Sequence, residues 1–91
     1  MDTTKYDPRT IVPQDSQWYP RVLDACGKVQ PDGRPVVVGQ VHVGDKIAGE
    51  LSLVRHSHQS GILMMYSSGG RAMTMVESAV DRMLTMGATL A

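Results

Sequence analysis

The sequence predicts a small α+β domain, and three observations support that prediction. Two runs rich in β-forming residues, 36–43 and 47–55, flank a Gly-Asp turn. A third apolar run occupies 61–67 and ends at a pair of glycines. Apolar residues then recur every three or four positions within 71–86, the spacing that places them on one face of a helix. We therefore expect a short N-terminal helix, a three-stranded antiparallel sheet and a C-terminal amphipathic helix packed on one face of that sheet.

The chain before the sheet divides into an arm and a helix. Residues 1–14 contain two prolines among polar residues, a pattern typical of a flexible or extended arm without regular structure. Asp15 or Ser16 can cap a short helix that runs to about Cys26. We expect the arm to precede a single domain that spans 15–91.

Side-chain alternation indicates the register of the first hairpin. A two-residue turn would mix polar and apolar residues on both faces, so we favour a three-residue loop at 44–46. That loop gives three opposed pairs: Val43 with Ile47, Val41 with Gly49, and Val37 with Leu53.

The third strand is apolar on both sides. Ile62, Met64 and Tyr66 point one way along an extended chain, and Leu63 and Met65 point the other way. A strand with one solvated face alternates, so we expect this strand to be covered on both faces. The C-terminal helix covers one face. The arm, the first helix or another subunit then supplies the second cover.

Composition and charge disfavour several classes of function. The 91 residues include nine basic and nine acidic ones, and this net charge of zero is mixed along the chain with no basic stripe. We therefore expect no binding to nucleic acid or to membranes. No apolar run approaches the roughly 20 residues of a membrane span. The single cysteine fits a reducing compartment, so the sequence predicts a soluble, cytoplasmic protein.

The turn Ser67-Ser68-Gly69-Gly70-Arg71 is the candidate ligand site. Backbone N–H groups at a helix start bind anions, two glycines let a phosphate approach the backbone, and Arg71 adds positive charge. The spacing matches neither a P-loop nor a dinucleotide-binding motif. A serine-capped tight turn is the simpler interpretation, and no cofactor is expected.

The sequence predicts no metal site and no catalytic residue. His56 and His58 are close enough to share an ion, with Asp32 or Cys26 as a further ligand, but the set lacks the spacing of structural zinc sites. On that spacing we interpret both as solvated loop histidines. His42 cannot join them, because it lies beside Ala48, eight residues and roughly 26 Å from His56 along an extended strand. Cys26 at a helix C-terminus meets the negative end of the helix dipole, which raises a thiol pKa and opposes reactivity.

Methionines form the remaining pattern. Six of the seven lie between Met64 and Met86, and methionine serves both in cores and in adaptable protein-binding surfaces. Apolar residues without a cover in so small a domain indicate an interface. The candidate interface residues are Tyr6, Met64, Met65, Tyr66 and Met73.

These observations predict a non-enzymatic protein–protein interaction module, a small regulator or inhibitor that binds another protein and forms a homodimer. The alternative is a domain that binds a small molecule, nucleotide or anion at the 67–71 turn, with or without enzymatic activity.

Overall fold

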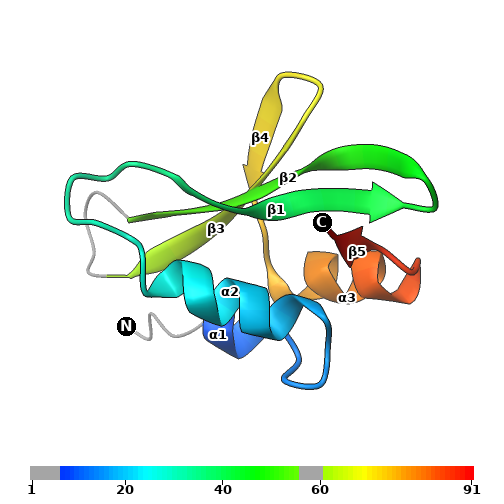
Figure 1. Ribbon diagram of the computed structural model, residues 1–91, viewed down its shortest axis with the longest axis horizontal. Helices are drawn as coiled ribbons and strands as arrows, with labels where there is room; N and C mark the ends of the chain where they lie inside the picture. The colour runs from blue at the N-terminus through cyan, green and yellow to red at the C-terminus, as the bar shows by residue number, and fades with distance from the viewer. Residues whose placement is uncertain (1–6, 56–60) are drawn as a thin grey trace.

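In the part of the chain that the structure describes, residues 7–55 and 61–91, a five-stranded antiparallel sheet carries three short helices on one side (Figure 1). The elements of this computed structural model are α1 (Pro8–Ile11), α2 (Trp18–Cys26), β1 (Val36–Val43), β2 (Lys46–Arg55), β3 (Ile62–Ser68), β4 (Arg71–Thr74), α3 (Glu77–Thr85) and β5 (Thr89–Leu90). The strands lie in the order β4-β3-β2-β1-β5. The predicted α+β class, antiparallel sheet and C-terminal helix are confirmed. The predicted number of strands is wrong, because β4 and β5 extend the sheet at its two edges.

The β1–β2 hairpin closes with a two-residue turn instead of the predicted three-residue loop. Val43 pairs with Lys46, and the turn residue Gly44 has a φ of 66°. Glycine at the first turn position fits the type II′ geometry, whose twist matches that of the flanking strands. The predicted pairing of Val43 with Ile47 is therefore wrong.

A bulge near this turn restores the register farther along the hairpin. The register shifts between Val41 and His42, which leaves Ala48 without a paired residue on β1. Val41 consequently pairs with Gly49, as predicted, although the turn is shorter than predicted. The extra residue in β2 compensates for the residue that the turn lacks.

A second irregularity determines which valine of β1 is buried. The register shifts again between Val37 and Gly39, and Leu53 pairs with Val36 instead of the predicted Val37. Val38 points into the core, whereas Val37 is 57% exposed. A shift of one residue moves a side chain to the other face of a sheet, so Val37 lies on the face away from the helices.

The predicted helix over 71–86 is a strand followed by a shorter helix. Gly69 and Gly70 have φ values of 61° and 81°, and they close a second hairpin in which β4 pairs with β3. A type I′ turn needs positive φ at both of these positions, and glycine adopts it without a steric penalty. Met73 and Met75 also fit the period of two of a strand, an alternative that the helical spacing concealed.

The described part of the segment expected to be an arm contains a helix, α1. Pro8 lies in the first turn of α1, where no backbone N–H is needed, and Asp7 caps this turn by accepting the N–H of Arg9 at 2.9 Å. Ile11 is buried in the core. Proline therefore starts a helix here instead of preventing one, and residues 1–6 lie outside the described range.

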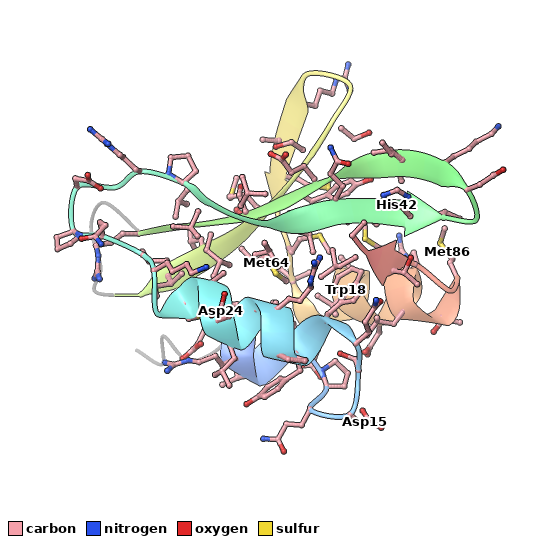
Figure 2. All side chains as sticks on the ribbon, in the orientation of Figure 1. Asp15, Trp18, Asp24, His42, Met64 and Met86 are labelled. Atoms are coloured by element: carbon pink, nitrogen blue, oxygen red, sulfur yellow. The ribbon has the colours of Figure 1, made fainter. Side chains whose placement is uncertain are left out.

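The first predicted helix is present as α2. It ends at Cys26, as expected, but it begins at Trp18, and neither predicted cap is used. Trp18 is fully buried between α2, α3 and the sheet (Figure 2). Its indole Nε1–H donates to the carbonyl of Ala88 at 3.3 Å, which ties the start of α2 to the segment between α3 and β5.

The core lies between the helices and one face of the sheet. Its buried side chains are all apolar: Ile11, Val12, Trp18, Val22, Ala25, Val38, Val41, Leu51, Leu53, Met64, Met75, Val80, Ala88 and Leu90. Met64 of β3 faces this core, whereas Leu63 and Met65 are half-buried on the opposite face of the sheet. None of the described helices is long and apolar enough to cross a membrane.

Candidate functional site

A groove on the helical side of the sheet lies between the β3–β4 hairpin and α3. It has a volume of about 240 Å³. Its lining comes from the four longest strands and α3 and is apolar. Among the described residues that line it, Arg82 is the only charged one. We call it the methionine groove and define it by Tyr66, Met73, Met75, Arg82, Met83 and Met86.

Tyr66 and Met73 form the wall on the hairpin side. They are directly paired across β3 and β4, so their side chains share one face of the sheet. The Tyr66 hydroxyl donates to the carbonyl of Ala48 at 3.0 Å. The ring lies over Gly49, where a Cβ atom would be only 2.6 Å from two ring atoms. The absence of a side chain at Gly49 therefore makes room for the ring.

α3 and the residues on either side of it form the rest of the groove. Met75, which precedes the helix, is 2% exposed, and its N–H donates to the carbonyl of Met64 at 2.8 Å. Met83 is half-buried on α3. Met86 is the C-cap residue and lies at the end of α3 (Figure 2). The helix therefore places one methionine within the groove and the next at its rim.

The rim of the groove is apolar and exposed. Met73 and Met86 are each 59% exposed. Single exposed apolar side chains are common on protein surfaces. Here two of them, Met73 and Met86, lie beside one apolar hollow.

A second hollow, of about 280 Å³, adjoins the groove along the β3–β4 hairpin. Tyr66 and Met73 line both hollows, and Ser68, Arg71 and Ala72 complete the second. Each hollow is lined by one positively charged side chain, Arg82 in the first and Arg71 in the second. The shared residues make them one continuous surface.

The candidate ligand turn, 67–71, joins two strands and does not open a helix. Ser68 Oγ donates to the carbonyl of Ala48 at 2.8 Å, so this hydroxyl links the end of β3 to β2 and caps no helix. Ser67 lies on the opposite face of the sheet, as the alternation requires. The helix dipole therefore contributes nothing to anion binding at this turn. Ser68 and Arg71 still border the second hollow, and anion binding by this turn stays a prediction.

The predicted interface residues are separated in the structure. Tyr66 and Met73 meet in the methionine groove. Met64 is 1% exposed, because the helices cover that side of β3. Met65 is half-buried on the opposite face of the sheet. Tyr6 lies outside the described residues.

The helical spacing of the sequence placed Met75, Met83 and Met86 in the apolar stripe of one helix. Met75 is indeed buried, but Met83 and Met86 line a groove together with Arg82. Helical spacing identifies the residues that share a face, and it does not reveal whether another element covers that face. The predicted helix already ended at 86, where Met86 is the C-cap residue and Gly87 follows.

Other reactive groups are scattered over the described chain. Burial raises the pKa of the Cys26 thiol, which is the predicted direction, although the prediction invoked the helix dipole. His42 Nε2 is buried without a hydrogen-bond partner among the described residues. Within 7–55 and 61–91, no three His, Cys, Asp or Glu side chains are placed to hold a metal ion. His56 and His58 lie outside these ranges.

Comparison of this chain with protein-family models, curated proteins and solved structures finds no match.

Proposed function

We propose that this protein is a non-enzymatic interaction module of the cytoplasm that binds a partner protein at the methionine groove. The supporting observation is the pair Met73 and Met86, each 59% exposed beside one apolar hollow. Apolar patches of this kind are sites of association, because covering them removes apolar surface from water. Methionine side chains adapt to the shape of a partner at low cost.

The shape and charge of the groove favour a protein segment as the ligand. The groove continues into the second hollow through Tyr66 and Met73, so the surface extends along the hairpin. Its charged side chains, Arg82 and Arg71, are both positive. A segment with apolar anchors and an acidic residue beside them would match both features.

A photo-crosslinking amino acid at Met86 tests this proposal. In extracts of the native host, we expect it to capture a protein that the same amino acid at Thr85 does not capture. Thr85 is an exposed position one residue earlier, so it controls for chance contact. The captured protein is then identified and purified.

Calorimetry with the purified partner supplies the quantitative test. Met86→Glu places a charge in the apolar rim and is expected to weaken binding at least about tenfold. Thr85→Glu is expected to leave the affinity unchanged. Equal affinities for the two variants would contradict the proposed site.

A second candidate function is supported by the second hollow alone. Arg71 and Ser68 border a space of about 280 Å³ beside Tyr66, and a guanidinium suits an anionic group on a small ligand. NMR titration with inorganic phosphate and with adenosine monophosphate would move the Arg71 Nε–H resonance. Unchanged Arg71 and Ser68 resonances at millimolar ligand would reject this candidate.

A further inference from the structure

The two edges of the sheet differ in how their backbone groups are satisfied. At the β5 edge, Gln40 and Ala91 exchange backbone hydrogen bonds of 2.9 and 3.2 Å. The N–H and C=O of Leu90, one residue earlier, therefore point away from β1. The side-chain amide of Gln17 forms a hydrogen bond with each of these two groups. The Leu90 N–H donates to Gln17 Oε1 at 3.2 Å, and Gln17 Nε2 donates to the Leu90 carbonyl at 3.4 Å. A side chain thus closes this edge.

The β4 edge has no comparable cover in the described chain. The hairpin turn at 69–70 and the N–H of Met75, which donates to the carbonyl of Met64, fix the alternation of the ladder. Odd-numbered residues of β4 direct their backbone groups toward β3. Ala72 and Thr74 therefore direct theirs outward, and no backbone hydrogen bond of the described residues outside the ladder engages them.

The middle of β4 lacks the charge, proline and bulge that protect many edge strands, although β4 itself has only four residues. All four of its residues are exposed. Between Ala72 and Thr74 there is no charged residue, no proline and no register shift against β3. The turn of the β3–β4 hairpin projects away from the helices (Figure 1). An edge of this kind is a template for an added strand.

We propose that a second copy of this chain pairs with β4 through its own β4, antiparallel and about a two-fold axis at Met73. Ala72 of each copy then exchanges two backbone hydrogen bonds with Thr74 of the other copy. The two Met73 residues lie opposite each other as a non-hydrogen-bonded pair, with Cα atoms about 4.5 Å apart. The two sheets become one continuous sheet.

Side chains and charges favour this occupant. Met73 is 59% exposed on the groove side of the sheet, and the pairing gives it an apolar neighbour at the axis. Arg71 begins β4 and Glu77 follows its other end. Antiparallel pairing therefore brings the positive end of each strand toward the negative end of the other. The inference rests on the proposed function, since it names one interaction of the module. It uses the backbone edge of β4, and Met73 belongs to both this edge and the groove.

Sedimentation velocity on the full chain, from about 1 μM to about 1 mM, tests the pairing. Ala72→Pro is the decisive variant, because the Ala72 N–H points outward. Proline there removes no hydrogen bond of the folded monomer, yet it blocks the added strand. Ala72→Ser is the matched control. We expect the wild-type chain and Ala72→Ser to dimerise, and Ala72→Pro to associate at least about tenfold more weakly.

Two results would overturn the pairing. One is a wild-type chain that stays monomeric at the highest concentration, and the other is Ala72→Pro dimerising as well as Ala72→Ser. A cysteine crosslink gives a readout that does not depend on the proline variant. In a Cys26→Ser background, Met73→Cys with oxidised glutathione is expected to form a disulfide across the axis, whereas Thr85→Cys stays unlinked. Equal yields at the two positions also overturn the pairing.

The outcomes separate this inference from the proposed function. If the wild-type chain is monomeric and Met86→Glu weakens partner binding, the groove proposal stands and the β4 pairing is wrong. If the chain dimerises through β4 and Met86→Glu leaves binding of the partner protein unchanged, the β4 pairing stands and the groove proposal is wrong.

Discussion

The ring of Tyr66 lies over the backbone of Gly49, and the missing side chain at Gly49 is what admits it. A Cβ at that position would stand 2.5 Å from the carbonyl oxygen of Ser67 and 2.6 Å from two ring atoms of Tyr66. The hydroxyl of the same ring donates to the carbonyl of Ala48 on the neighbouring strand, β2. The wall of the methionine groove therefore depends on Gly49. The sequence pattern identified this residue only as the partner of Val41 in the hairpin.

Gly49→Ala is expected to destabilise the protein by about 2 kcal/mol, because both the ring and a backbone carbonyl must move to admit one methyl group. Such a loss corresponds to a decrease in Tm of about 10 °C for a domain of this size. Thermal unfolding followed by circular dichroism measures it. Gly61→Ala is the matched control, since its added Cβ would meet no atom within 4 Å. A Gly49→Ala variant as stable as Gly61→Ala would contradict this packing.

Gly70→Ala tests whether the chain after Gly69 is a strand or a helix. Gly70 has a φ of 81°, a conformation that costs alanine about 1 kcal/mol. If a helix began here instead, alanine would stabilise it by about the same amount. The structure therefore predicts a lower urea midpoint for Gly70→Ala. Gly69→Asn is expected to be nearly neutral, because asparagine followed by glycine suits a type I′ turn. A raised midpoint for Gly70→Ala would indicate a helix.

Sequence reasoning succeeded where one periodicity was unambiguous. The first hairpin, the third strand and the end of α2 at Cys26 were all predictable, because β-formers cluster and Gly27 follows the helix. It failed where two periodicities overlapped. Met73 and Met75 alternate as in a strand, and Met75 and Ala79 are spaced as in a helix. Gly69 and Gly70, both with positive φ, form a hairpin turn and so favour the strand. The sequence pattern had indicated that these two glycines form the turn before a helix.

Features that depend on tertiary contacts instead of local sequence patterns were not predicted. β5 has two residues and exists because it pairs with Val41 and His42 of β1. The compensating extra residue at Ala48 leaves no local pattern, so the turn length and the register could not both be inferred. The groove escaped for the same reason. Its walls come from strands and a helix whose relative placement no spacing encodes.

Asp7 is expected to make stability depend on pH in the acid range. Its carboxylate accepts the N–H and the guanidinium of Arg9, and the side-chain hydrogen bond with Arg9 holds the pKa of Asp7 below its usual value. A folded-state pKa below the unfolded one stabilises the fold above the unfolded pKa of about 3.9. The contribution is lost as pH falls through the folded pKa. Asp7→Asn removes it.

Chemical denaturation at a series of pH values checks this dependence. The stability difference between wild type and Asp7→Asn is expected to be about 0.5 kcal/mol at pH 6, because the pair is partly solvated. It should shrink toward zero below pH 4. Asp45→Asn, at an exposed turn residue without an ion pair among the described residues, serves as the control. A difference that grows on acidification would show that the pKa shift has the opposite sign.

Gln17→Ala is expected to loosen the β5 edge. The variant loses both hydrogen bonds to Leu90 and leaves the N–H and C=O of that residue without a protein partner. Two partly buried hydrogen bonds contribute about 1–2 kcal/mol. Hydrogen exchange of the Leu90 amide should accelerate, and the free energy of unfolding should fall by about that amount. Gln14→Ala, at an exposed residue, is expected to change neither.

Gln17→Glu separates the two bonds. Glutamate can still accept the Leu90 N–H, but its carboxylate would face the Leu90 carbonyl, where the amide now donates. We expect this variant to be less stable than Gln17→Ala at pH 7 and to recover below pH 4, where the protonated carboxyl donates in place of the amide. A Gln17→Glu variant as stable as wild type at pH 7, with slow Leu90 exchange, would show that the amide does not close the sheet edge.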